Sequence, residues 1–518
     1  MIREFRQLTQ YATPLPLFLC LILAAGCAVD QEKEISRYRR VLDHGAAGLA
    51  VDYLPGETLS LQRALLLANR DNERLAIAGE EYLQALIEKD RAAASFPPTV
   101  GIEPSYTITD RASSGSGGAV GTIGGFRPVG STLRRFEAPV VSRVNLFNGF
   151  GDVARLRGAR AESERLRLLL LDQQALILLD VAQVYFQVLR SERQVAVLEA
   201  SLAVQAERVA DVGARQQAGL ARPLDVSQTR AQEAATRVAL VSARSDVTNG
   251  RTTLATLVGV DRVDGPLSDA FGDDLSPAVA LAPLASFEEK ALAGREDVTA
   301  ARAAVRAAGQ GVHEAFNQYY PSLGLNLTGF LYREDYADAS KWTAVLNANV
   351  PIFTAGEIEA DVRRAWSLLR RAALFESLAR REALEGVRLA YENVSASRQR
   401  LNGLDTQVQA AREALEQAEG SYRVGLATNL ERLTAQSALL DAELQLASEQ
   451  FDQALLLLDL TRFTGRLGNG GGSLRFRGSG TTNDRFDDGR TGTGTGTGTT
   501  GVFRTSATDG DNFGAGNR

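Results

Sequence analysis

The residues best suited to catalysis or metal binding are few in this chain and far apart. It contains two cysteines, Cys20 and Cys27, and two histidines, His44 and His313. A metal site needs three or four such ligands at short range, and nucleophilic catalysis needs a base beside the nucleophile. A Gly-rich phosphate-binding loop followed by Lys is also absent from the sequence. We therefore expect no enzyme, no cofactor and no metal site.

The overall charge argues against a second class of function. The formal net charge is −6 over 518 residues, whereas nucleic-acid-binding domains normally carry a basic face. We therefore expect no nucleic-acid partner. The length is sufficient for two or more domains or for one elongated domain.

One of the cysteines follows an export signal. The apolar run PLPLFLCLILAAGC ends at Cys27 and follows two arginines. A basic start, a short apolar stretch and small residues are typical of a secretory signal, and the run is short for a transmembrane helix. The segment LAAGC, residues 23–27, resembles the lipobox of bacterial lipoproteins, which implies removal of residues 1–26 and lipidation of Cys27. An ordinary signal peptide with an incidental cysteine is the alternative.

Two related short segments interrupt long helix-like stretches. AGLARPLD covers 218–225 and VGLATNLE covers 424–431, 206 residues later. A glycine directly after a helix commonly adopts a left-handed conformation that ends it, so we expect tight turns that reverse the chain. Asp225 and Glu431 occupy equivalent positions beside these turns. The turn residues are Gly219, Leu220, Ala221, Gly425, Leu426 and Ala427.

The spacing of 206 residues extends well beyond the turns and indicates an internal repeat. It relates Phe147 to Phe353 and Gly259 to Gly465. Upstream of Phe147 the offset becomes 223, so 17 extra residues lie between Pro98 and Phe147, an interval that contains the Gly- and Ser-rich stretch 112–125. A fixed offset of this kind is the signature of a tandem duplication.

Each repeat has the same order of expected elements: a helix, two strands, a very long helix and a shorter returning helix. Apolar residues in the long helices step by alternating threes and fours, which is the pattern of a coiled-coil seam. The strand segments alternate and have the length of a membrane-spanning strand, roughly 9–11 residues. The expected helices are 60–95, 152–217, 224–257, 286–318, 357–423 and 430–463, and the expected strands are 99–110, 132–146, 322–333 and 341–352.

The number of strands has a consequence for assembly. A sheet that faces lipid cannot leave its edges unpaired, because no water is available to bind the free N–H and C=O groups. Four strands are too few to close a barrel with a useful bore. Three copies would supply twelve strands, so we expect a homotrimer.

The ordered set of elements resembles the TolC-type outer-membrane efflux family. VNLFNGFG (144–151) and VPIFTAGE (350–357) are similar to its strand-to-helix junctions, and the two glycine turns are similar to its helix tips. The resemblance implies an α+β membrane protein: a trimeric outer-membrane β-barrel continuous with a long periplasmic α-helical coiled-coil barrel. It also implies a passive channel that works with a periplasmic adaptor and an inner-membrane transporter, anchored in outer-membrane lipid through Cys27.

The same resemblance implies roles for individual residues. The tips are where the helical barrel closes and where adaptors dock. Glu431 matches an acid that helps form a constricting ring, Asp225 is its counterpart, and Tyr422 matches a tyrosine that supports the closed state. Thr434 stands where relatives can carry a second acid, and Ala427 where they can carry a basic residue. The alternative is that these are ordinary solvated tip charges.

The remaining expectations concern boundaries and competing functions. Phe147 and Phe353 mark the strand-to-helix junctions, where we expect packing contacts. A periplasmic adaptor or a structural coiled-coil lipoprotein without a pore is the alternative function, and the choice between efflux and protein secretion stays open. The expected segments are a signal peptide 1–26, a lipidated linker 27–58, a first repeat 59–261, a connection 262–283, a second repeat 284–467 and a disordered Gly/Thr-rich tail 468–518.

Overall fold

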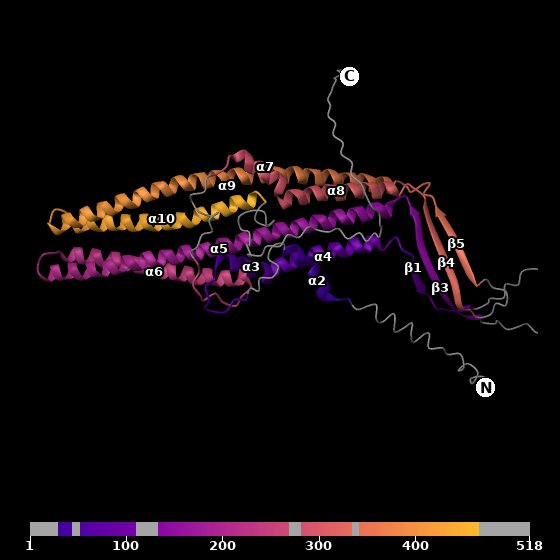
Figure 1. Cartoon of the computed structure of the whole chain (residues 1–518), viewed down its shortest axis with the longest axis horizontal. Helices are drawn as coiled ribbons and strands as arrows, with labels where there is room; N and C mark the ends of the chain where they lie inside the picture. Colours follow the sequence, from indigo (N-terminus) through magenta and orange to yellow (C-terminus); the bar gives the residue numbers. More distant parts are fainter. Residues whose placement is uncertain (1–28, 44–51, 110–132, 269–280, 334–340, 466–518) are drawn as a thin grey trace, which may run out of the picture. The chain divides into compact units, whose positions relative to one another are not determined.

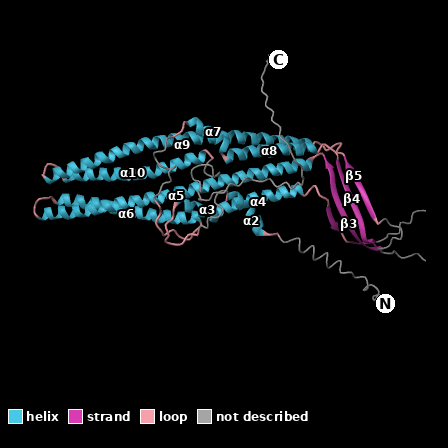
Figure 2. Cartoon of the chain, viewed as in Figure 1, coloured by secondary structure: helices cyan, strands magenta, loops and turns pink. Residues whose placement is uncertain are grey.

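The computed structural model describes residues 29–43, 52–109, 133–268, 281–333 and 341–465. The predicted signal peptide, the lipidation candidate Cys27, the Gly-rich stretch 112–125 and the Gly/Thr-rich tail lie outside these ranges. Within them the chain is mainly helical, with one small sheet (Figures 1 and 2). The helices are α2 (Gln31–Leu42), α3 (Leu61–Asp71), α4 (Glu73–Ala93), α5 (Gly151–Gln217), α6 (Pro223–Val258), α7 (Leu284–Gly294), α8 (Glu296–Asn317), α9 (Glu357–Arg423) and α10 (Asn429–Phe463).

The first helix expected in each repeat is in fact two helices. Asn72 takes an extended conformation, with φ −73° and ψ 121°, between α3 and α4. Its side chain accepts hydrogen bonds from the backbone N–H groups of Arg74 and Leu75, which caps α4. Arg295 breaks the second repeat at the equivalent place, between α7 and α8, with φ −71° and ψ 129°. The continuous helices expected over 60–95 and 286–318 were therefore wrong at these two joints.

The sheet has four strand positions, all antiparallel. β1 (Thr99–Ile102) and β2 (Ser105–Thr109) pair with the same edge of β3 (Leu133–Asn148), so together they replace the single expected strand 99–110. Pro104 lies between them and lacks the N–H that a continuous ladder requires. β3 pairs with β4, and β4 with β5; these two strands are Ser322–Arg333 and Trp342–Asn349.

The long helices form two hairpins through the expected seams. α5 and α9 each have 67 residues, which corresponds to roughly 100 Å of helix. α6 packs along α5, and α10 packs along α9 (Figure 1). Seam residues repeat as buried pairs at the 206-residue offset: Val181 with Val387 and Val188 with Val394, all 0% exposed. Burial of such a shared apolar stripe supplies most of the stability of a helical pair.

The middle of α5 is the centre of the largest hydrophobic core. Tyr185 is 1% exposed there, and its hydroxyl donates to the carbonyl oxygen of Leu59 over 2.8 Å and accepts from the N–H of Ser268 over 2.9 Å. Leu59 and Leu267 also form a parallel β-bridge. One buried phenol therefore joins both connecting segments to the long helix, and the buried polar groups satisfy each other.

Among the described helices, only α5 contains a stretch long and apolar enough to cross a membrane. In that stretch 56% of the residues are buried inside the fold. A covered apolar stretch is typical of a core helix, and the core around Tyr185 accounts for it.

Candidate functional site

The two glycine turns end α5 and α9 with the same hydrogen-bond pattern. Gly219 and Gly425 have φ of +76° and +80°. The N–H of Leu220 bonds the carbonyl of Arg215 over 2.7 Å, and that of Leu426 bonds the carbonyl of Ser421 over 2.8 Å. These are Schellman caps, in which a left-handed residue closes the helix. The turns lie where the sequence predicted them, and glycine is required there for its backbone conformation.

The leucines at both turns remain exposed. Leu220 is 79% and Leu426 is 85% exposed in the single chain. Leu224 and Leu430, at the next equivalent pair of positions, are 55% and 59% exposed. Each hairpin tip therefore presents two apolar side chains to its surroundings.

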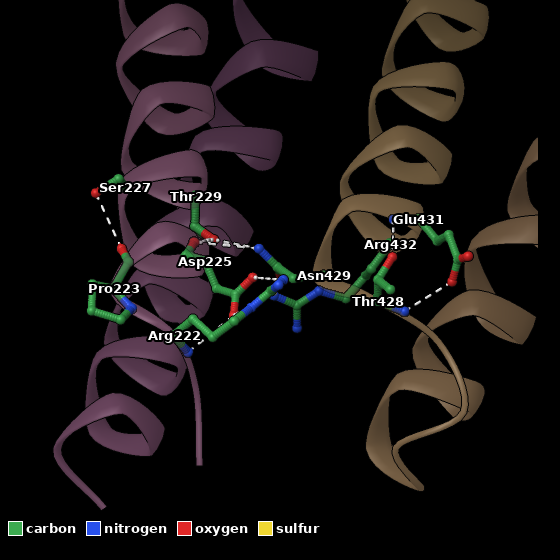
Figure 3. Close-up of polar contacts among 9 residues, drawn as sticks. All are labelled: Arg222, Pro223, Asp225, Ser227, Thr229, Thr428, Asn429, Glu431 and Arg432. Atoms are coloured by element: carbon green, nitrogen blue, oxygen red, sulfur yellow. Dashed lines mark hydrogen bonds and ion pairs between the residues drawn. The ribbon is translucent and has the colours of Figure 1, made fainter. Parts of the chain in front are cut away.

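The two acids predicted beside the turns cap the N-termini of the returning helices α6 and α10. The Glu431 carboxylate accepts the N–H of Thr428 over 2.8 Å, and the Thr428 hydroxyl accepts the N–H of Glu431 over 3.2 Å (Figure 3). This reciprocal pair is a capping box. The pattern Thr-x-x-Glu announces it in the sequence, and the sequence-based interpretation missed this local role. Glu431 itself is exposed.

Asp225 has a similar position but a different environment. It accepts the N–H of Arg222 over 3.0 Å and two hydrogen bonds from the Arg222 guanidinium, at 3.0 and 3.2 Å. The guanidinium holds the pKa of the Asp225 carboxyl below its usual value. Asp225 is only 7% exposed. The two equivalent acids therefore differ: Asp225 is buried and paired with an arginine, whereas Glu431 is exposed.

Tyr422, near the end of α9, lies between two arginines. The guanidinium carbon of Arg432 is 4.3 Å from the centre of its ring, and that of Arg215 is 5.4 Å away. Arg432 is 5% exposed and donates to the side-chain oxygen of Asn429 over 2.9 Å. Cation–π contacts of this kind gain strength where water is excluded. The ring thus joins the end of α5 to the start of α10.

Asn429 of α10 connects this group of side chains to α6 of the other hairpin (Figure 3). Its side-chain NH₂ donates to the carbonyl oxygen of Asp225 over 3.3 Å and to the hydroxyl of Thr229 over 3.2 Å. Further along, Arg208 of α5 bonds Gln436 of α10 and Glu419 of α9. We call this set of residues the hairpin latch: Arg208, Asp225, Thr229, Glu419, Tyr422, Asn429, Arg432 and Gln436.

Most latch residues were absent from the sequence-based prediction, although a signal existed. At the 206-residue offset Asn429 corresponds to Pro223, and Gln436 to Arg230. Two repeats that bind each other side by side need different groups at the positions that meet. The positions at which the two repeats carry different residues therefore indicate where the hairpins touch. Positions with similar residues, such as Asp225 and Glu431, are less informative.

The two strand-to-helix junctions place their phenylalanines in different surroundings. Phe147 lies at the end of β3 and packs edge-on against Phe150, with ring centroids 5.3 Å apart. Phe353 lies between β5 and α9 but is 87% exposed in the single chain. The single chain thus leaves Phe353 exposed, and the packing expected at this junction stays a prediction for the assembled channel.

The polar side chains of the described ranges serve mainly structural roles. Within them the structure brings together no group of three or more His, Cys, Asp or Glu side chains able to hold a metal ion. The polar side chains near the tips are instead committed to caps and to contacts between hairpins.

Comparison with known proteins identifies the architecture. The model of the outer membrane efflux protein family matches residues 64–260 and 288–466. The chain belongs to the outer membrane efflux protein family. BepC of Brucella suis, an outer membrane efflux protein, is 25% identical over 62% of this chain and 70% of its own length. TolC of Vibrio cholerae is 27% identical over 57% of this chain and 68% of its own length.

Solved structures show that the efflux-protein fold extends over most of the chain. CusC superimposes with a TM-score of 0.70 at 18% identity, covering 80% of this chain and 95% of that one. VceC of Vibrio cholerae gives 0.67 at 22% identity, covering 78% and 96%. The predicted fold class is confirmed. The outer membrane efflux protein described here is a subunit of a passive outer-membrane channel of tripartite systems and not an enzyme, and it extends into the periplasm.

The channel function decides between the alternatives left open by the sequence. A periplasmic adaptor and a pore-free structural lipoprotein are both excluded by membership of the family. Channels of the TolC type are trimers that work with an adaptor and an inner-membrane transporter, in agreement with the four strand positions per chain.

Proposed function

We propose that this channel exports small molecules, that it is anchored in outer-membrane lipid through Cys27, and that its helical end is held shut by the hairpin latch with Glu431 at the constriction. The observation that carries the gate is the contact between Asn429 and Asp225, because it fixes the start of α10 to the start of α6. Opening the helical end requires these two hairpins to separate, which breaks the contact.

Small-molecule export is favoured over protein secretion by the nature of the relatives. OpmQ of Pseudomonas putida, named for pyoverdine export, is 29% identical over 53% of this chain. AprF of Pseudomonas aeruginosa, named for alkaline protease secretion, matches over only 36%. Substrate choice in tripartite systems rests largely on the inner-membrane transporter, so the transporter that copurifies with this channel decides the cargo class.

The exposed turns are the proposed docking surface for the periplasmic adaptor. The side chains of Leu220 and Leu426 point away from the hairpins and have no partner inside the described chain that would bury them. Apolar anchors surrounded by polar residues are typical of protein interfaces. Photo-crosslinkers placed at Leu220 and Leu426 should capture the adaptor, whereas one at the exposed strand residue Leu346 should not.

The gate is tested by single-channel conductance in planar bilayers with two substitutions of Glu431. Glu431→Gln keeps the capping box, because glutamine accepts the same N–H, but removes the negative charge. Glu431→Ala removes both. A higher conductance with both variants supports a charged constriction. A change with Glu431→Ala alone assigns the residue to the cap and removes it from the gate.

A further inference from the structure

The joint between α7 and α8 holds the end of α10. Arg295 is the only residue between the two helices, and Gly465 follows α10 with φ +70°. A Cβ atom added to Gly465 would lie 2.3 Å from the carbonyl oxygen of Gly294, so the two backbones are in direct contact. Any change in this joint therefore acts on the point where the returning helix of the second repeat ends.

The first repeat has the same joint, but the side chain that reaches its returning helix is neutral. Asn72 corresponds to Arg295, and its side-chain NH₂ donates to the carbonyl of Leu257 in α6 over 2.9 Å. Gly259, the counterpart of Gly465, lies against Asp71: an added Cβ would be 2.9 Å from its carbonyl oxygen. This hydrogen bond involves no titratable group. The charged pair beside the joint, Arg70 and Asp71, lies toward solvent, with side chains 50% and 31% exposed.

In the second repeat the corresponding contacts are made by charged groups. The guanidinium of Arg295 lies 5.3 Å from the ring centre of Phe463, which corresponds to Leu257. It also makes two hydrogen bonds to Asp297, at 2.9 and 2.6 Å. From α5, Asp172 approaches Arg462 of α10 at 3.8 Å. α9 places Gly386 against the Phe463 ring, and its charged side chains pair elsewhere on the two helices, Arg388 with Glu288 of α7 over 2.6 Å and Glu376 with Arg302 of α8 over 3.6 Å.

Glu296 is the most deeply buried acid of this cluster, at 4% exposed. Burial, followed by the negative charges of Asp172 and Asp297, raises the pKa of Glu296 to about 7. Burial also raises the pKa of Asp172 and of the α10 residue Asp459. The counterpart of Glu296 in the first repeat, Glu73, is exposed. The cluster thus gathers four acids around two arginines, whereas the described residues at the first joint place one exposed arginine, Arg70, beside Asp52 and Asp71.

We propose that the protonation state of Glu296 controls the α7–α8 joint of the second repeat. Protonated Glu296 stabilises the packing of the joint against the end of α10, and loss of the proton weakens this packing. The direct consequence is asymmetry between the two hairpins, because α6 is held by the neutral side-chain amide of Asn72. Rising pH therefore acts on the α9–α10 hairpin and leaves the base of the α5–α6 hairpin unchanged. This inference goes beyond channel function and does not depend on the gate residues.

The sign follows from linkage between protonation and opening. Glu296 binds its proton more tightly in the closed joint than in water, so protonation favours the closed joint. That advantage is present at acid pH and is lost as pH rises through about 7. For an acid that regains its ordinary pKa on opening, the opening equilibrium increases about tenfold between pH 6 and pH 8.

Hydrogen–deuterium exchange of the detergent-solubilised full-length channel tests the proposal. Peptides that cover 288–300 and 455–465 report the second joint, and peptides that cover 66–78 and 252–260 report the first. After correction for intrinsic exchange rates, we expect protection of the second joint to fall about tenfold from pH 6 to pH 8. Protection of the first joint should stay constant. Glu296→Gln should remove the pH dependence, and Glu73→Gln, its exposed counterpart, should retain it.

Asp172→Asn provides a second variant in case Glu296→Gln does not assemble. Removal of the Asp172 charge lowers the proton affinity of Glu296, so the midpoint of the protection profile should move to lower pH. A purely structural role for Asp172 would change protection at every pH and leave the midpoint in place. The proposal is overturned if wild-type protection at 288–300 is flat between pH 6 and pH 8, or if both joints loosen equally. Persistence of the pH dependence in Glu296→Gln would also overturn it.

Discussion

Asn429, the first residue of α10, donates its side-chain NH₂ to the backbone carbonyl of Asp225, the third residue of α6. The two residues are 204 positions apart in the chain, at the starts of the two returning helices. This contact places the tips of two separate hairpins side by side and does so through a neutral amide.

Removal of the Asn429 side chain should open the channel. Asn429→Ala leaves the buried Arg432 guanidinium and the Thr229 hydroxyl without this partner, at a cost of roughly 1–3 kcal/mol to the closed arrangement. We expect a higher single-channel conductance and longer open times in planar bilayers. Ser227→Ala is the matched control, because the exposed Ser227 hydroxyl, also at a hairpin tip, bonds the carbonyl of Pro223 in its own helix. Equal behaviour of the two variants would remove the latch from the gating mechanism.

The glycine turns should depend on backbone conformation and not on space. A Cβ atom at Gly219 would meet no atom within 4 Å, yet φ is +76°. Gly219→Ala should therefore destabilise the hairpin by about 1–2 kcal/mol through left-handed strain alone. Gly213 lies in the same helix, is also open to a Cβ and has no positive φ. Gly213→Ala should stabilise the helix by about 0.5–1 kcal/mol. Thermal unfolding followed by circular dichroism distinguishes the two, and shifts of the same sign would contradict this account.

Gly386 should be needed for the opposite reason, namely space. It lies within α9, and a Cβ there would be 2.4 Å from a ring carbon of Phe463. Gly386→Ala should destabilise the fold by about 1–3 kcal/mol through overpacking. Gly403, in the same helix, has nothing within 4 Å of an added Cβ, so Gly403→Ala is the control. Equal midpoints in chemical unfolding would show that Phe463 adjusts without cost.

Lipid attachment at Cys27 predicts that the chain incorporates a labelled fatty acid at this residue. Cells grown with an alkyne-bearing palmitate should label the wild-type chain, and Cys27→Ser should abolish the label. The matched control is Cys20→Ser, because Cys20 lies in the segment 1–26 that the proposed lipidation would remove. Retention of label in Cys27→Ser would place the lipid elsewhere and leave an ordinary signal peptide as the explanation of the N-terminus.

The sequence alone determined the features that depend on local periodicity. The seams through Val181 and Val387, the bounds of α9 and the left-handed glycines follow from residue spacing within a few turns of helix. The number of strand positions follows from alternation, and the tandem duplication follows from a fixed offset. These features carry the family and the channel function, because they are read directly from the order of elements along the chain.

Tertiary structure decided the features that depend on unlike partners at long range. The tie between Asn429 and Asp225 and the contact between Arg295 and Phe463 join residues more than a hundred positions apart. The same position in two similar repeats carries Asn72 in one and Arg295 in the other, and only packing shows that both hold a returning helix. Local propensity cannot specify such contacts, because the energy of a buried polar group is set by whatever partner the fold brings to it.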